Sequence, residues 1–283
     1  MLRNVLVFGL LVIIKEANAG FGKSVLITGS NRGQGLEWVK QLSTMENPPD
    51  YIFATCRKPN DTEYVRNLKA AADRSTRAKV IISKLDVTNV DDICRVVDEV
   101  HQITGSDGLN VLINNAGVLN FSSQALDELH PPSLVYTYQV NSMGPVLMAK
   151  HFAQLLKLGA QSRRETSGMN VNKAAIINIS SIAGSIFAAV SISRAAAAWG
   201  GLTEYSMSKA ALNMATRKLS VEFRPRDVLV VAFHPGHVRT DMGGPTAPVT
   251  TEEAINAMML SMESFNSTHT GGYFERTGEV IPY

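Results

Sequence analysis

Short apolar segments alternate with helical segments along most of the chain, and this alternation restricts the fold more than any other feature. Apolar runs that fit buried strands lie at 24–28, 51–55, 79–83, 109–113, 174–179, 228–233 and 273–274. Helices are expected at 35–43, 62–72, 91–103, 134–158 and 204–223, with a last one from the cap Thr250 to about 262. Strand-helix-strand units of this kind close by right-handed crossovers, which make the strands parallel. The sequence therefore predicts a single doubly wound parallel α/β sheet with helices on both faces.

The first 21 residues do not follow this pattern. Arg3 precedes an apolar run over 5–14, and an Ala17-Asn18-Ala19 ending follows it. A basic start, a short apolar run and an A-x-A-like ending are typical of a secretory signal peptide, and the run is too short to span a bilayer comfortably. We therefore expect an extension at 1–21, either a signal peptide or a plain extension, and one domain at 22–283.

Composition excludes some classes of function. Hydrophobic residues make up 45% of the 283 residues and charged residues 18%, which fits a globular enzyme with a full core. The formal net charge is only +2, and no dense block of Lys and Arg appears, so we expect no nucleic-acid partner. Two cysteines are too few for a disulfide framework, which leaves one bridge or, the interpretation we favour, two free thiols in a reducing compartment.

A glycine-rich segment, Thr28-Gly-Ser-Asn-Arg-Gly-Gln-Gly35, links the first predicted strand to the first predicted helix. Its spacing is G-x-x-x-G-x-G. Glycines permit a tight turn and a close approach of the backbone, and a helix N-terminus attracts pyrophosphate. The segment therefore predicts a dinucleotide site that includes Gly29, Ser30, Gly33 and Gly35, although glycine-rich turns also follow strands for structural reasons alone.

Two arginines indicate which dinucleotide binds. An NAD site usually has an acidic residue about 20 residues past the glycines. Here Arg57 follows the second strand instead, and Arg32 lies inside the glycine loop. Two guanidinium groups near the adenosine ribose favour a 2′-phosphate, so we predict NADP(H). Asp86 and Val87 after the third strand, and Asn115 after the fourth, are expected at the same edge of the sheet, with the first two at the adenine.

A tyrosine and a lysine on one predicted helix suggest proton transfer. Of the seven tyrosines, only Tyr205 has a lysine four residues on, Lys209, and positions i and i+4 share a helix face. Free tyrosine has a pKa of about 10, which a nearby cation lowers, so the phenol would approach the range of a general acid or base. Ser181 ends the preceding strand, where its hydroxyl can bond a substrate carbonyl. Asn141 lies among apolar neighbours and needs partners.

Taken in order, these segments resemble the classical type of the short-chain dehydrogenase/reductase superfamily, from Gly22 onward. The resemblance rests on TGSNRGQG, LDVT, NNAG, VNSMG, ISSIAG, YSMSK and HPGHVRTDMGG. The part from Lys209 to Tyr283 is similar to the C-factor/sniffer-like carbonyl reductase branch. The resemblance implies a Rossmann-type NADP-binding domain and a catalytic tetrad of Asn141, Ser181, Tyr205 and Lys209.

The resemblance also implies roles for these residues. Tyr205 would donate a proton to a carbonyl oxygen that Ser181 orients. Lys209 would lower the pKa of the tyrosine and hold the nicotinamide ribose, and Asn141 would keep a water in the proton relay. Val238 and Thr240 match the segment beside the nicotinamide.

Three features depart from the family pattern. Gln34 stands where the family usually has an apolar residue near the nicotinamide. The interval between Ser181 and Tyr205 is longer than usual, with the surplus around 185–200 beside the expected substrate opening. The apolar N-terminus is the third departure. The substrate is therefore not predicted.

We expect an NADP(H)-dependent oxidoreductase that reduces a carbonyl to an alcohol by hydride transfer; the alternative is a protein of this fold that signals or acts as a scaffold without turnover. A surface-anchored interaction protein is suggested by the N-terminus alone.

The expected partner is a small carbonyl or alcohol. No transmembrane span is expected, and the resemblance implies a homodimer or homotetramer. No metal is expected, because His234 and His237 have no evident third ligand. Cytoplasm is the expected location, since NADP is scarce outside the cell, and the secretory pathway is the alternative.

Overall fold

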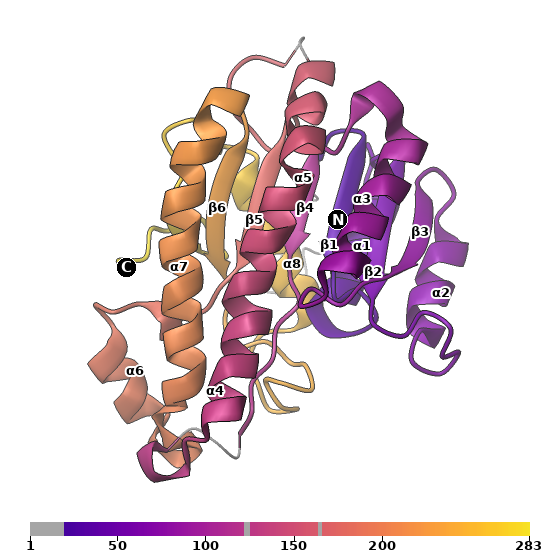
Figure 1. The fold of residues 1–283 in the computed structure, drawn as a ribbon. Coiled ribbons are helices and arrows are strands. Elements are labelled where there is room, and N and C mark those ends of the chain that lie inside the picture. The colour runs from indigo at the N-terminus through magenta and orange to yellow at the C-terminus, as the bar shows by residue number, and fades with distance from the viewer. Residues whose placement is uncertain (1–19, 122–124, 164–165) are drawn as a thin grey trace, which may run out of the picture.

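A parallel seven-stranded sheet forms the centre of the computed structural model, which describes residues 20–121, 125–163 and 166–283 (Figure 1). The strands are β1 (Ser24–Thr28), β2 (Tyr51–Cys56), β3 (Lys79–Lys84), β4 (Val111–Asn114), β5 (Ala175–Ile179), β6 (Leu229–His234) and β7 (Tyr273–Glu275). Their order in the sheet is β3-β2-β1-β4-β5-β6-β7, and every neighbouring pair is parallel. The predicted fold class is confirmed. The apolar run and cleavage motif of the expected extension lie outside the described residues.

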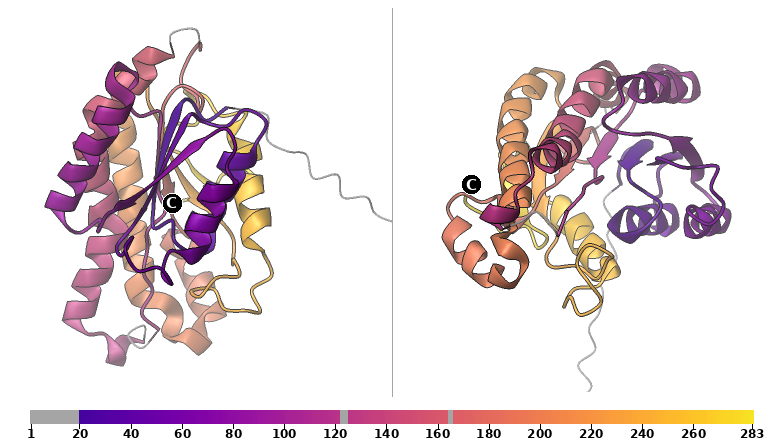
Figure 2. Two further views of the ribbon diagram at one scale, coloured as in Figure 1. Left: turned by 90° about the vertical axis from the view of Figure 1, so that its right-hand side faces the viewer. Right: turned by 60° about the horizontal axis from the view of Figure 1, so that its bottom comes forward.

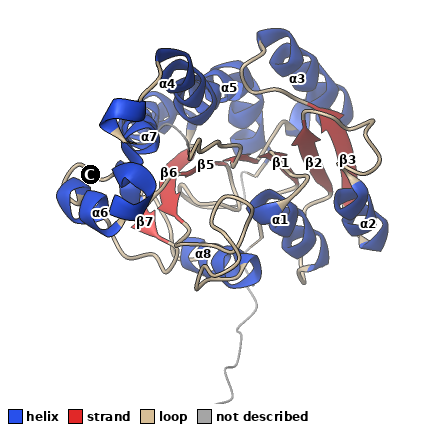
Figure 3. Ribbon diagram, turned by 90° about the horizontal axis from the view of Figure 1, so that it is seen from below, coloured by secondary structure: helices blue, strands red, loops and turns tan. Residues whose placement is uncertain are grey.

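Helices cover both faces of the sheet (Figures 2 and 3). The helices are α1 (Gly33–Thr44), α2 (Arg66–Arg74), α3 (Val90–Thr104), α4 (Pro131–Tyr138), α5 (Gly144–Ser162), α6 (Ala189–Ala195), α7 (Thr203–Phe223) and α8 (Thr251–Met262). Side chains of a strand alternate between faces, so Val25 and Ile27 join the core beneath α1, α2 and α8. Leu26 joins the opposite core, beneath α3 and α5. Both faces of each central strand are therefore buried, which explains the continuous apolar runs in the sequence.

The long helix expected over 134–158 is instead interrupted. It begins at Pro131, passes through a π-helical turn at Gln139–Met143 and continues as α5. Pro145 has no N–H and cannot donate to the carbonyl of Asn141, while the N–H of Gly144 donates five residues back to Gln139. The proline thus favours the wider turn, and Asn141 lies inside it.

The surplus segment before Tyr205 has structure that the sequence did not predict. It forms α6 and then a 3₁₀ turn at Ala197–Leu202, which leads directly into α7. The expected cap of the last helix is confirmed, because Thr250 and Glu253 form a reciprocal capping box at the start of α8. None of the helices in the described ranges is long and apolar enough to cross a membrane.

Candidate active site

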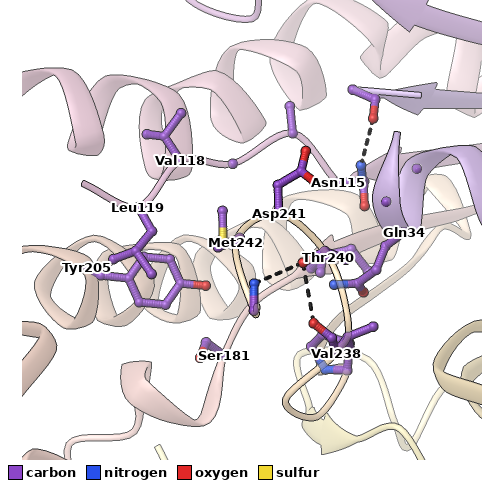
Figure 4. A pocket seen from close by; sticks show the side chains of 18 of the residues that line it. Gln34, Asn115, Val118, Leu119, Ser181, Tyr205, Val238, Thr240, Asp241 and Met242 are labelled. Atoms are coloured by element: carbon purple, nitrogen blue, oxygen red, sulfur yellow. Dashed lines mark hydrogen bonds between the residues drawn. The ribbon is translucent and has the colours of Figure 1, made fainter. Parts of the chain in front are cut away.

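A cavity of about 790 Å³ opens at the carboxyl ends of the strands, and segments that follow β1, β2, β3, β4, β5 and β6 line it together with Tyr205 and Lys209. The strand order reverses between β1 and β4, where the connections leave in opposite directions, and ligands of open α/β sheets bind at this point. The topology therefore places the glycine loop and the Tyr205–Lys209 pair at one cavity. Figure 4 shows Gln34 of the loop and Tyr205 in this cavity.

The glycine loop shapes one wall of this cavity. Gly29 and Gly33 have φ values of +70° and +53°, in the region that favours glycine. A Cβ on Gly35 would lie 2.1 Å from the carbonyl oxygen of Gly29, so no larger residue fits there. Arg32 precedes α1 and makes no side-chain cap with it, and the first turn of α1 has no acidic residue. This arrangement suits a phosphate at the helix N-terminus.

Ser30 differs from its neighbours in the loop, because it does not line the cavity. It is fully buried, its hydroxyl donates to the carbonyl of Ile27 at 2.9 Å, and its N–H donates to the carbonyl of Thr55 at 2.9 Å. The hydroxyl and the backbone N–H of Ser30 therefore both tie the glycine loop to the sheet. The structure gives no support to direct cofactor binding by this residue.

The two arginines both line the cavity, and each already has a partner. The guanidinium of Arg32 forms an ion pair with Asp241 at 2.5 Å, between the glycine loop and the segment after β6. The guanidinium of Arg57 donates to the hydroxyl of Tyr136 at 3.2 Å. Both side chains are exposed, so a phosphate can replace or share these contacts.

Asp86, Val87 and Asn115 also line the cavity. The Asp86 carboxylate accepts from the backbone and hydroxyl of Thr88 at 2.9 and 2.6 Å, which fixes its orientation. The Asn115 side-chain amide donates to the carbonyls of Thr28 and Gly29 at 2.9 and 3.2 Å (Figure 4). Asn115 therefore ties the end of β4 to the glycine loop.

Asn141 is fully buried and does not line the cavity, although it lies close behind it. Its side-chain oxygen accepts from the N–H of Val118 at 2.8 Å. Its amide nitrogen donates to the carbonyl of Val118 at 2.9 Å and to the hydroxyl of Ser208 at 3.0 Å. These bonds connect the loop after β4 to α7, so the visible role of the Asn141 side chain is to position Val118. The sequence alone did not indicate this role.

Tyr205, Ser181 and Lys209 meet at the inner part of the cavity. Tyr205 and Ser181 share a side-chain hydrogen bond, and Figure 4 shows the phenol pointing into the cavity above Ser181. The Lys209 ammonium donates to the carbonyl of Ile179 at 2.8 Å and lies 5.6 Å from the centroid of the Tyr205 ring. Ser180, by contrast, donates to Asn213 at 2.6 Å and is buried. Of the two adjacent serines, Ser181 is therefore the one placed for chemistry.

Burial dominates the acid–base properties of Tyr205 and Lys209. It raises the pKa of Tyr205 to about 12, and the hydrogen bond from Ser181 opposes it only in part. Burial also lowers the pKa of Lys209 to about 8. The expected lowering of the tyrosine pKa by Lys209 is therefore wrong for the protein alone, because loss of hydration on burial raises this pKa by more than the hydrogen bond with Ser181 lowers it. At neutral pH the phenol keeps its proton and Lys209 is charged.

Two further polar groups face the cavity without a protein partner. The side-chain oxygen Oε1 of Gln34 and the ring nitrogen Nδ1 of His234 are buried, and neither atom forms a hydrogen bond within the protein. Burial lowers the pKa of His234 to about 4, so this imidazole is neutral. Val238 and Thr240 are the remaining predicted cofactor contacts. Both line the cavity, and Thr240 lies against the glycine loop. Within the described ranges, no cluster of three or more His, Cys, Asp or Glu could hold a metal.

The residues around the outer cavity fit a phosphorylated dinucleotide. They combine positive-φ glycines, an uncapped helix N-terminus and two arginines, and the half-buried Gln34 and His234 of the same cavity each offer a buried polar atom that has no protein partner. Each of these features favours an elongated anionic ligand with further polar groups at one end.

Comparisons with known proteins agree with this geometry. A family model described as short chain dehydrogenase matches residues 23–249. C-signal of Myxococcus xanthus is 33% identical over 175 residues, which span 62% of this chain and 93% of that protein. The carbonyl reductase Sniffer of D. melanogaster is 35% identical, with a TM-score of 0.84 over 93% of this chain and all of that chain. An NADPH-bound carbonyl reductase from chicken fatty liver is 35% identical, with a TM-score of 0.84 over 93% of this chain and 99% of that chain.

Proposed function

Because the chain belongs to the short-chain dehydrogenase family, we propose that it uses NADP(H) to reduce a carbonyl group to an alcohol, with Tyr205 as the proton donor. One observation carries this proposal. The phenol of Tyr205 points into the cavity, is hydrogen-bonded to Ser181 and has the Lys209 ammonium 5.6 Å from its ring centroid.

The outer cavity supports the cofactor part of the proposal. Arg32 and Arg57 would hold the 2′-phosphate, the N-terminus of α1 would hold the pyrophosphate, and Val238 and Thr240 would border the nicotinamide. When bound, the reduced nicotinamide supplies the hydride. The chicken carbonyl reductase, whose structure contains NADPH, is similar to this chain over nearly its whole length.

The protein's own residues would then handle the proton. Ser181 orients the carbonyl oxygen, and Tyr205 gives that oxygen its phenolic proton while the carbonyl carbon gains the hydride, which completes a two-electron reduction. A tyrosine pKa of about 12 keeps the phenol protonated beforehand. Lys209, with a pKa of about 8, would stabilise the resulting phenolate and can return a proton to it. Asn141 acts by positioning Val118, not by contact with the substrate.

Turnover on carbonyl compounds tests the proposal. NADPH oxidation is followed with a panel of aldehydes, ketones and quinones for the native protein, Tyr205→Phe and Tyr138→Phe. Tyr138 is an exposed tyrosine away from the cavity and serves as the matched control. We expect turnover that Tyr205→Phe abolishes and Tyr138→Phe preserves. No turnover on any carbonyl, or equal turnover by both variants, would favour the alternative of a non-enzymatic scaffold.

We also propose a homodimer or homotetramer formed through α5 and α7. Met207, Met214 and Val221 are 60 to 70% exposed along α7 at intervals of seven residues, which puts them on one side of the helix. Light scattering tests the proposal: a multiple of the 30.7 kDa chain mass is expected, and Met214→Glu should reduce it. A native monomer at micromolar concentration would contradict the proposal.

For residues 22–283 we propose one domain that works in the cytoplasm. All seven strands between Ser24 and Glu275 share one sheet, and both cysteines are free thiols. N-terminal sequencing of protein isolated from its natural host tests the location. Met1 or Leu2 at the N-terminus supports it, whereas Gly20 would indicate signal-peptide cleavage.

A further inference from the structure

The surplus segment between Ser181 and Tyr205 forms one wall of the cavity. Ile192, Ala195 and Ala196, on or directly after α6, line the cavity, and the spacing i, i+3, i+4 places them on one side of the helix. Val190 of the same helix is 64% exposed and does not line the cavity. The helix therefore presents one isoleucine and two small alanines to the cavity, which leaves space next to an apolar surface.

The facing walls are apolar as well. Val118, Leu119 and Phe121 follow β4, Ile182 follows β5 and Met242 follows β6, and all of them line the cavity. Figure 4 shows Val118, Leu119 and Met242 around the phenol of Tyr205. A substrate whose carbonyl reaches Tyr205 must therefore place its remaining atoms among hydrocarbon side chains.

The charged groups of the cavity are not available to a substrate. Arg32, Arg57 and Asp86 belong to the outer end that would hold the cofactor, and Asp241 is paired with Arg32. Lys209 is buried and donates to the carbonyl of Ile179. Among the described lining residues, the inner end offers the neutral hydroxyls of Ser181 and Tyr205 but no unpaired charge that could accompany a charged substrate.

We infer that the segment 185–202 selects an uncharged carbonyl compound with a bulky apolar substituent, which packs against Ile192, Ala195 and Ala196. Burial of apolar area favours such a substrate, and a carboxylate would lose its hydration without gaining a partner. The inference rests on the proposed reductase function, and it identifies Ile192 as a specificity-determining residue.

The experiment compares three probes in the presence of NADPH: methyl 4-acetylbenzoate, its carboxylate 4-acetylbenzoate, and the small neutral butane-2,3-dione. Native protein should prefer the ester over the carboxylate by roughly tenfold or more in kcat/KM. Ile192→Asp should lower kcat/KM for the ester by roughly tenfold, mainly through KM, because it replaces apolar contact by a charge. Butane-2,3-dione should be little affected, since it is too small to need this wall.

Two further variants separate specificity from folding. Val190→Asp places the same charge on the exposed side of α6 and should leave all three probes unchanged. Ala195→Phe adds no charge but fills the space, so it should reduce turnover of the ester and spare butane-2,3-dione. Equal use of ester and carboxylate, equal loss on all probes in Ile192→Asp, or the same loss in Val190→Asp would overturn the inference.

Binding decides the inference independently of the proposed function. The ester and the carboxylate are titrated into the NADPH complex, and the fluorescence of the bound cofactor is recorded. Tighter binding of the ester that Ile192→Asp removes supports the inference even if no probe is turned over, in which case only the proposed reductase function fails. No preference in binding overturns the inference even if Tyr205-dependent turnover is observed.

Discussion

Replacement of Asn141 by alanine should destabilise the protein far more than an ordinary asparagine substitution. The side chain is fully buried and makes three hydrogen bonds, two with the backbone of Val118 and one with Ser208. At about 1 kcal/mol for each bond, the free energy of unfolding should fall by about 3 kcal/mol. For a chain of this length, that loss corresponds to about 6 to 12 °C in Tm.

Urea unfolding followed by circular dichroism measures this loss. Ser208→Ala removes one of the three bonds, together with the bond that the Ser208 hydroxyl donates to the carbonyl of Tyr205, and should cost about 1 to 2 kcal/mol. Asn60→Ala, at an exposed site, should cost less than about 0.5 kcal/mol. Asn141→Asp should be no better than alanine, because it loses both donated bonds and buries a charge. If Asn141→Ala unfolded at the same urea concentration as Asn60→Ala, the positioning role of Asn141 would be refuted.

Three further predictions concern the cofactor and the proton. Carbonyl reduction should decline as the pH rises through about 8, because burial lowers the Lys209 pKa to that value and the neutral amine no longer stabilises a phenolate. A flat kcat profile from pH 6 to 10 would count against the role of Lys209 in stabilising the phenolate. Arg57→Ala should weaken NADPH binding by roughly tenfold or more and NADH binding much less, measured by fluorescence titration with Lys58→Ala as control; equal losses would defeat the NADP assignment. Gly35→Ala should abolish cofactor binding, since its Cβ would lie 2.1 Å from the carbonyl oxygen of Gly29, and unchanged affinity in a folded variant would contradict the geometry of the loop.

The sheet could be predicted because its signals are local. Val25, Leu26 and Ile27 form a continuous apolar run, and each contacts one of the two cores. A strand buried on both faces has this composition wherever it occurs, so the number of strands and their parallel arrangement follow from the sequence. The π-helical turn around Asn141 was not predicted, because its apolar spacing is that of a helix and only Pro145 signals the interruption.

The site was predicted less completely, because it depends on contacts across the chain. The sequence indicated that Asn141 needs partners, but Val118 and Ser208 lie 23 and 67 residues away and meet it only in the fold. The direction of the Tyr205 pKa shift depends on burial, which an i, i+4 pair does not reveal. Ser30 looked like its neighbours in the glycine loop, yet its side chain turns into the sheet.

The role of Tyr205 as proton donor is tested most directly by single-turnover reduction in the preformed NADPH complex. The rate of NADPH consumption is measured for the native protein and for Tyr205→Phe, together with the Kd of NADPH for each. We expect the variant to bind NADPH with nearly unchanged affinity and to reduce the carbonyl at least about a thousandfold more slowly, since it lacks only the transferable proton. A Tyr205→Phe variant that binds NADPH and reduces the carbonyl at the native rate would contradict the account.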